Sequence, residues 1–319
     1  MKIGMIFEVQ DLKRPWTCWF VRVINNRGGR LHLRYITQIN SIEEDSSFDI
    51  HIFYLDRRVH PIGWTSKNCG NYSFDLPACF SSIIDKQELI DYCFNESKKY
   101  FYPPDLFKEQ EETSKHRFTE GMKLEVFQIE TKNLHIGRIG TIHNEFYFDV
   151  RIDNDDGNEI SFVAHATHPH ILPAHWAAEH KLALMNGKGI RQTEDYWNSY
   201  TEKNGMADLA PERCFNLITL NGAGANQVEP GMKMEMIYTL NDKDFVFSVT
   251  LIHVADHLMW LRVDNPTLFQ HDAQLFYHVL PINSLDIFPI GWAKFNGFEL
   301  ITPIEYQMDI QTYERNQYE

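Results

Sequence analysis

The chain has 319 residues, which is more than one ordinary hydrophobic core contains, so we expect two or three compact units. A content of 43% hydrophobic and 13% aromatic residues excludes a disordered chain, and no stretch approaches the roughly 18 apolar residues of a membrane helix. The formal net charge of −14 disfavours direct binding to nucleic acid and favours basic partners.

Two short phrases occur as a pair three times along the chain. A glycine–methionine phrase stands at Gly4–Glu8, Gly121–Glu125 and Gly231–Glu235, and a turn that ends in tryptophan stands at 60–64, 172–176 and 288–292. From the glutamate to the tryptophan the separations are 56, 51 and 57 residues. The near-constant spacing predicts one structural module in three copies, with Glu8, Glu125 and Glu235 at equivalent positions.

Each copy contains short runs of β-branched and aromatic residues between the two phrases. Examples are "CWFVRVI" and "RLHLRYI" in the first copy, "EFYFDVRI" in the second, and "FVFSVTLI" and "HLMWLRV" in the third. Turn signals such as "NNRGG" and "DNDDG" separate the runs. Short strands with tight turns in units of this size predict a mainly β chain of small, curled, barrel-like sheets.

The segments between the copies have a different character. Residues 85–107 and 191–215 are partly helical in spacing, and each ends in a Pro-x-x-x-Phe phrase. We interpret both as helical arms that pack on a neighbouring core. The predicted boundaries are 1–79 for the first repeat, 80–186 for the second, 187–302 for the third and 303–319 for a C-terminal tail. The tail carries enough apolar residues that we expect part of it to pack on the body of the protein.

The paired phrases, the strand-rich middle and the arms together resemble the MBT (malignant brain tumour) repeat. The resemblance covers nearly the whole chain and implies three tandem barrel-like repeats with helical arms, packed into a compact three-lobed assembly. It further implies a nuclear, chromatin-associated protein without enzymatic activity, with methylated histone tails and repressor proteins as partners. One repeat of such proteins binds mono- or dimethyl-lysine.

The chemistry of such a pocket follows from the ligand. A methylated ammonium ion stays cationic but is poorly hydrated, so aromatic ring faces attract it. With one or two methyl groups it keeps an N–H that a carboxylate can accept. A pocket therefore needs an acidic residue and about three aromatic walls.

By the resemblance, the first repeat places Asp11 at the carboxylate position, Tyr35 at the first aromatic position and Phe48 at the last. It departs from the family in two ways: Arg14 stands where the family has asparagine, and the loop before Phe48 has no tryptophan. The corresponding positions of the other two repeats lack a complete set: Gln128, Ile152 or Asp153 and Ile160 in the second, and Tyr238, Val263 and Phe276 in the third.

Simpler interpretations of these residues remain open. Asp11 can cap a turn, and Tyr35 and Phe48 can fill the barrel. The chain is therefore either a methyl-lysine reader that uses the first repeat, or a scaffold without a working pocket that binds proteins through its arms and acidic surface. The histidines of 165–175 lack neighbouring cysteine or acidic ligands, so we expect no metal. No catalytic motif, cofactor site or membrane segment is predicted.

Overall fold

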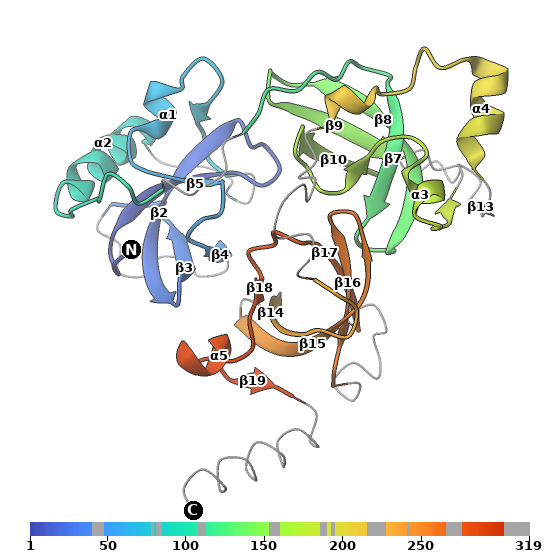
Figure 1. Ribbon diagram of the computed structural model, residues 1–319. Coiled ribbons are helices and arrows are strands. Elements are labelled where there is room, and N and C mark those ends of the chain that lie inside the picture. Colours follow the sequence, from blue (N-terminus) through green and yellow to red (C-terminus); the bar gives the residue numbers. More distant parts are fainter. Residues whose placement is uncertain are drawn as a thin grey trace, which may run out of the picture. The chain divides into compact units, whose positions relative to one another are not determined.

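The structure is a computed structural model that describes residues 1–39, 48–77, 80, 85–107, 113–152, 160–185, 190–192, 195–215, 228–240, 243–265 and 276–302. As predicted, it is mainly β with a few short helices (Figure 1). The chain divides into two compact units, Met1–Gln128 with Asn133–Leu217, and Ile129–Lys132 with Ile218–Glu319. Among the described residues no helix is long and apolar enough to cross a bilayer. The predicted packing of the tail at 303–319 lies outside the described residues.

The first repeat is a curled antiparallel sheet in the order β4-β3-β2-β1-β5, with β6 parallel to β2. Its elements are β1 (Ile6–Gln10), β2 (Thr17–Arg27), β3 (Arg30–Tyr35), β4 (Ile50–Phe53), β5 (Val59–His60), the one-turn helix α1 (Trp64–Lys67) and β6 (Ser73–Phe74). Inward-facing side chains such as Phe7, Val21 and Leu33 are fully buried in its core.

The second repeat has the same arrangement, since β10, β9, β8, β7 and β11 pair in turn and β12 runs parallel to β8. Its elements are β7 (Lys123–Gln128), β8 (Asn133–Ile142), β9 (Tyr147–Ile152), β10 (Ile160–His165), β11 (Ile171–Leu172), α3 (Trp176–Glu179), β12 (Leu184–Met185) and β13 (Arg191–Gln192). The core centres on Leu124, Phe148 and Val150.

The third repeat forms a sheet in the order β17-β16-β15-β14-β18, with β19 parallel to β15. Its elements are β14 (Lys233–Leu240), β15 (Lys243–Ala255), β16 (Leu258–Val263), β17 (Tyr277–Pro281), β18 (Ile287–Phe288), α5 (Trp292–Phe295) and β19 (Leu300–Ile301). In all three repeats the register shifts between the second and third long strands, after Val23, Ile139 and Leu251. Such bulges increase the local twist, which helps a small sheet to curl.

One glutamate in each repeat binds the turn that ends in tryptophan. Glu8, Glu125 and Glu235 are at most 2% exposed. Their carboxylates accept backbone N–H bonds of 2.6–2.7 Å at the start of the one-turn helix, from Gly63 and Thr65, from Ala177, and from Gly291 and Ala293, respectively. A carboxylate satisfies amides that a helix start leaves without partners. The predicted equivalence of the three glutamates is confirmed, and the contact explains why the two phrases occur together.

Burial governs the protonation of two of these carboxyl groups. It raises the pKa of Glu8 above its usual value, and the hydrogen bonds from Thr65 and Gly63 oppose the rise. It raises the pKa of Glu125 to about 7, although Ala177 and the Trp197 indole, at 2.7 Å, donate to that carboxylate. Burial disfavours the charged form of these groups, and the N–H bonds around them favour it.

The residue before each turn tryptophan has a left-handed backbone. Gly63 and Gly291 have φ of 88° and 94°, and His175 has φ of 76° at the same position of the second repeat. Glycine takes this conformation without the steric cost that a Cβ adds. The tryptophan turn of the second repeat therefore keeps its shape with a residue that is strained there.

Gly291→Ala is expected to lower the stability of the second unit by about 1 kcal/mol, since an L-residue there meets backbone strain. A Cβ at Gly291 has no heavy atom within 4 Å, so no clash adds to the strain. Thermal denaturation of the variant measures the loss. Gly70→Ala is the matched control, because its Cβ would also meet open space and its φ is not positive. Equal thermal midpoints for Gly291→Ala and Gly70→Ala would show that alanine is not strained at position 291.

Both arms pack on the core that precedes them, which confirms that the arms contact a neighbouring core. The first arm contains α2 (Lys86–Ser97), and its Tyr102 hydroxyl donates to the Ile6 carbonyl at 2.8 Å. The second contains α4 (Tyr196–Asn204) and the 3₁₀ turn η2 (Glu212–Cys214). It ends with Phe215, whose ring lies 5.1 Å from that of Phe118 in the second core.

Side chains from the first two repeats meet within the first unit. The Gln10 amide donates to the Tyr147 hydroxyl at 2.8 Å, and the rings of Trp16 and His143 stack at 4.1 Å. Arg57 lies 2.8 Å from His165. Polar and aromatic contacts of this kind join the two repeats.

His60 lies beside these contacts and is 7% exposed. Its Nε2 is 3.0 Å from Oε1 of the Gln10 side chain, and its ring stacks on Trp64 at 3.6 Å. Burial lowers the pKa of His60 to about 3, with the Asp56 carboxylate opposing the shift and Arg57 adding to it. The imidazole is therefore neutral in the folded protein at neutral pH.

We expect His60→Gln to become more stable relative to the wild type as the pH falls. A lowered folded pKa contributes stability above the unfolded value, near 6.5, and loses it as the pH falls towards 3. Glutamine stays neutral and does not share this loss. Thermal midpoints of both proteins at pH 7 and pH 4.5 measure the difference. A difference that does not change with pH would show that His60 is not buried in its neutral form.

Candidate functional site

The three predicted site residues lie at the same end of the sheet of the first repeat. Asp11 follows β1 directly, Tyr35 ends β3, and Phe48 lies two residues before the start of β4. Strands β1 and β3 run antiparallel to β2, and β4 runs antiparallel to β3. The end of β1, the end of β3 and the start of β4 therefore lie at the same end of the sheet. The β3–β4 register pairs Leu33 with Ile50, and its continuation brings Phe48 opposite Tyr35.

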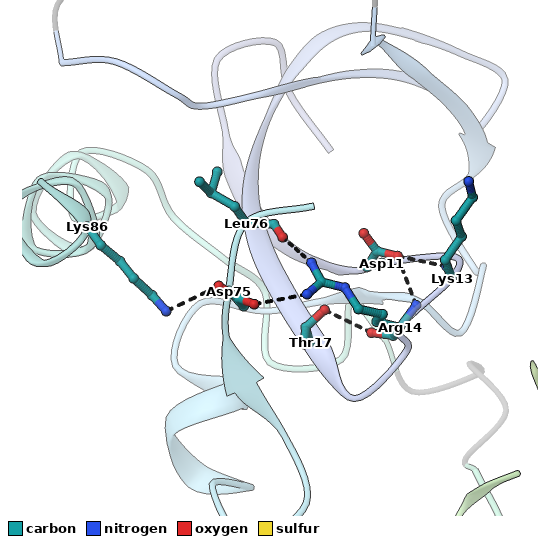
Figure 2. Close-up of polar contacts among 7 residues, drawn as sticks. All are labelled: Asp11, Lys13, Arg14, Thr17, Asp75, Leu76 and Lys86. Atoms are coloured by element: carbon teal, nitrogen blue, oxygen red, sulfur yellow. Dashed lines mark hydrogen bonds and ion pairs between the residues drawn. The ribbon is translucent and has the colours of Figure 1, made fainter. Parts of the chain in front are cut away.

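The carboxylate of Asp11 is oriented by its own loop. Its Oδ1 accepts hydrogen bonds from the backbone N–H groups of Lys13 and Arg14 at 2.7 and 2.9 Å (Figure 2). The residue as a whole is 7% exposed. The Asp11 N–H donates to the Thr17 carbonyl at 3.0 Å, which closes the loop. The turn-capping interpretation of Asp11 is confirmed, and its role as a ligand stays a prediction.

Tyr35 and Phe48 contact one further aromatic residue. The ring of Phe80 lies 5.5 Å from that of Tyr35 and 5.0 Å from that of Phe48, at interplanar angles of 80° and 66°. Tyr35 is 9% exposed and Phe48 is 37% exposed. Phe80 belongs to no strand of the sheet and to no motif of the repeat, so the sequence interpretation missed it.

Arg14 connects the Asp11 loop with the chain that leads to Phe80. Its guanidinium donates to the Asp75 carboxylate at 3.1 Å and to the Leu76 carbonyl, and Lys86 lies 3.5 Å from the same carboxylate (Figure 2). Position 14 counted in the sequence only as a departure from the family. In the structure it is an anchor for residues 75–76.

The equivalent positions of the second repeat hold no aromatic side chain. Gln128 is 8% exposed at the end of β7. Ile152 and Ile160 are strand partners across β9 and β10, where aliphatic side chains offer no π-face to a cation. Asp153, the other residue considered there, lies outside the described residues.

In the third repeat the aspartate position is part of a strand. Tyr238 lies within β14 opposite Phe245, and its ring is 5.2 Å from that of His278. Val263 is fully buried, and Phe276 contacts Tyr277 at 4.8 Å. A carboxylate loop like that of Asp11 is therefore replaced here by a continuous hairpin strand.

The histidines of the second repeat contact other protein groups. Burial and Arg57 lower the pKa of His165 to about 3, and burial lowers that of His168 well below its usual value. His175 Nδ1 lies 2.7 Å from the carboxylate of Asp195 at the start of α4. Within the described part of the chain, no group of three or more histidine, cysteine, aspartate or glutamate side chains is placed to hold a metal ion.

Comparison with curated proteins finds relatives over most of the chain. Scm-like with four MBT domains protein 2 of Mus musculus is 29% identical over 311 residues, which are 94% of this chain and 31% of that protein. MBT domain-containing protein 1 of Xenopus laevis is 28% identical over 284 residues, or 86% of this chain and 40% of the relative. The chain thus spans about a third of the length of the first relatives that it matches.

A solved structure has the same fold. It is the crystal structure of the four MBT repeats of Drosophila melanogaster Sfmbt in complex with the peptide RHR (me)K VLR, with a TM-score of 0.61 and 20% sequence identity. The likeness covers 95% of this chain and 67% of that one. The family description "mbt repeat" matches residues 5–73, 122–191 and 232–307, which together are more than half of the chain. Sequence, fold and the recurring glutamate contact agree, and the chain belongs to the MBT-repeat family.

Proposed function

We propose that the chain is a non-catalytic reader of mono- or dimethyl-lysine on histone tails, and that the first repeat carries the pocket. The observation that supports this most is the arrangement at one end of its sheet. There the oriented carboxylate of Asp11 lies at the same end of the sheet as the aromatic residues Tyr35 and Phe48. The second and third repeats lack this combination at the equivalent positions.

The chemistry of these groups suits a partly methylated ammonium ion. Aromatic faces attract its charge at little desolvation cost, and the carboxylate accepts its remaining N–H. A trimethylated ion has no N–H to donate, so it loses that bond. The proposed pocket therefore favours one or two methyl groups over three.

The charge of the protein supports a basic partner. A net charge of −14 attracts Lys- and Arg-rich histone tails and speeds their encounter. A reader of histone tails acts in the nucleus, and we propose a role in transcriptional repression together with other chromatin proteins. The relatives named above, among them the Scm-like proteins, support this assignment by membership of the same family.

A binding titration tests the proposal. Peptides of one histone-like basic sequence, with a single lysine carrying zero, one, two or three methyl groups, are titrated into the full chain by calorimetry or fluorescence anisotropy. We expect the mono- and dimethyl peptides to bind at least about tenfold more tightly than the unmodified one, which corresponds to about 1.4 kcal/mol. Equal affinities for all four peptides would overturn the proposal.

A scaffold that binds proteins without reading methylation is the second candidate. Exposed apolar side chains of the third repeat favour it, since Ile290 is 69% exposed and Phe295 is 90% exposed. Exposed apolar groups near one turn are typical of protein contact surfaces. Equal affinities for all four peptides would support the scaffold if the chain also binds a protein partner and Phe295→Ser abolishes that binding.

A further inference from the structure

We propose that Phe80 is the third aromatic wall of the methyl-lysine pocket and that Arg14 positions it. The inference rests on the function proposed above and identifies a binding residue that no motif of the repeat contains. Its first basis is ring geometry, and its second is the anchoring of the segment that carries Phe80.

Phe80 joins Tyr35 and Phe48 into one cluster of three rings. Phe80 stands nearly perpendicular to Tyr35 and to Phe48, at 80° and 66°, with centroids 5.5 and 5.0 Å away. In this proposal Phe80 is the back wall of the pocket, and Tyr35 and Phe48 are its side walls. A cation in that space would face the π-systems of three rings, and each of them adds attraction.

Phe80 supplies a ring that the loop before Phe48 does not. Residues 36–47 contain no aromatic side chain, although a pocket of this kind needs about three walls. Phe80 follows the sheet instead, six residues after β6 (Ser73–Phe74). The wall therefore comes from the segment between β6 and the first arm and not from the barrel loop.

Arg14 connects the wall to the carboxylate. Its backbone N–H binds Asp11 at 2.9 Å, while its guanidinium binds Asp75 at 3.1 Å and the Leu76 carbonyl. Phe80 lies four residues beyond Leu76, and its N–H donates to the Pro77 carbonyl at 3.0 Å. Arg14 thus holds the loop of Asp11 with its backbone and the base of the segment that carries Phe80 with its side chain, as Figure 2 shows for its polar contacts.

The ion pair alone is weak, because the Arg14 and Asp75 side chains are 35% and 45% exposed. The bond to the Leu76 carbonyl and the two-ended attachment give Arg14 its positioning role. Phe80 contacts the ligand in this proposal, whereas the Arg14 side chain acts only through the segment that carries Phe80.

The test uses the full chain and two small probes, Nα-acetyl-Nε-monomethyl-lysine methylamide and its unmethylated counterpart, titrated by NMR. Phe80→Leu keeps apolar bulk but removes the π-face, and we expect it to weaken binding of the methylated probe at least about fivefold. Phe80→Tyr should stay within about twofold of the wild type. Phe101→Leu is the matched control, because Phe101 is 80% exposed and belongs to the same unit.

The positioning role of Arg14 has a separate readout. Arg14→Gln is expected to weaken binding of the methylated probe when residue 80 is phenylalanine. The same substitution should have little effect on binding by the Phe80→Leu protein. A residue that only stabilises the fold would weaken binding equally in both backgrounds. The thermal midpoints of all variants show whether the fold is intact.

The outcomes separate the two proposals. If the wild type does not prefer the methylated probe, the proposed function fails. If it does prefer that probe and Phe80→Leu binds as tightly as the wild type, the function stands and the third wall is wrong. Tighter binding by Phe80→Leu would also overturn the wall, because it would show that the ring fills the pocket.

Discussion

Glu8→Ala is expected to lower the free energy of unfolding of the first unit by about 3 kcal/mol or more. The carboxylate is fully buried and accepts the amides of Gly63 and Thr65 at 2.6 and 2.7 Å. Alanine leaves both N–H groups without this acceptor, and each unsatisfied buried amide costs about 1–3 kcal/mol. The loss of side-chain volume in a packed interior adds to the cost.

Chemical denaturation of the variant measures the effect, and hydrogen exchange at the amides of Gly63 and Thr65 localises it. Both amides should exchange faster in the variant, even under conditions where the unit stays folded. Glu202→Ala is the control, because Glu202 is exposed on α4 in the same unit. Unchanged exchange at both amides would show that the glutamate does not hold the turn.

Asp11→Asn is expected to remove most of the preference for a methylated lysine, with a loss of about tenfold or more in affinity. The asparagine carbonyl can still accept the amides of Lys13 and Arg14, which Asp11 Oδ1 accepts at 2.7 and 2.9 Å. The loop should therefore keep its shape while the negative charge is lost. Asp11→Ala would remove the turn cap as well, so it is a poorer test.

Titrations with the unmodified and the monomethyl peptide measure this preference. Asp105→Asn is the control for the change of one unit in net charge, because Asp105 is exposed. We expect the control to keep the wild-type ratio of the two affinities. If Asp11→Asn keeps that ratio too, while the wild type prefers the methylated peptide, the reader function stands and Asp11 is not its carboxylate.

Several features of the fold are predictable from the sequence because they are local or periodic. The paired phrases predict three repeats, and the family match at 5–73, 122–191 and 232–307 confirms them. Alternating polarity predicts the strands, and partly helical spacing predicts α2 and α4. A glutamate at a near-constant distance from a turn predicts equivalent positions, which the contacts of Glu8, Glu125 and Glu235 confirm.

Part of the candidate site is predictable from the sequence, and part of it is seen only in the structure. Resemblance to the family picks out Asp11, Tyr35 and Phe48, since each has a fixed distance from a phrase of the repeat. The three-lobed arrangement and the predicted domain boundaries stay predictions. Within the first unit, the structure adds the contacts of Phe80 and Arg14, which the repeat pattern does not mark.

The sequence by itself determined the number of repeats, their strand-rich character, the helical arms and the residues at the motif positions. The tertiary structure alone decided which distant side chains meet. Arg14 reaches Asp75 and Leu76 across 61 and 62 residues, and Gln10 reaches Tyr147 across 137. Such contacts have no period or spacing, because they depend on how the closed sheets and the arm between them bring remote backbone segments together.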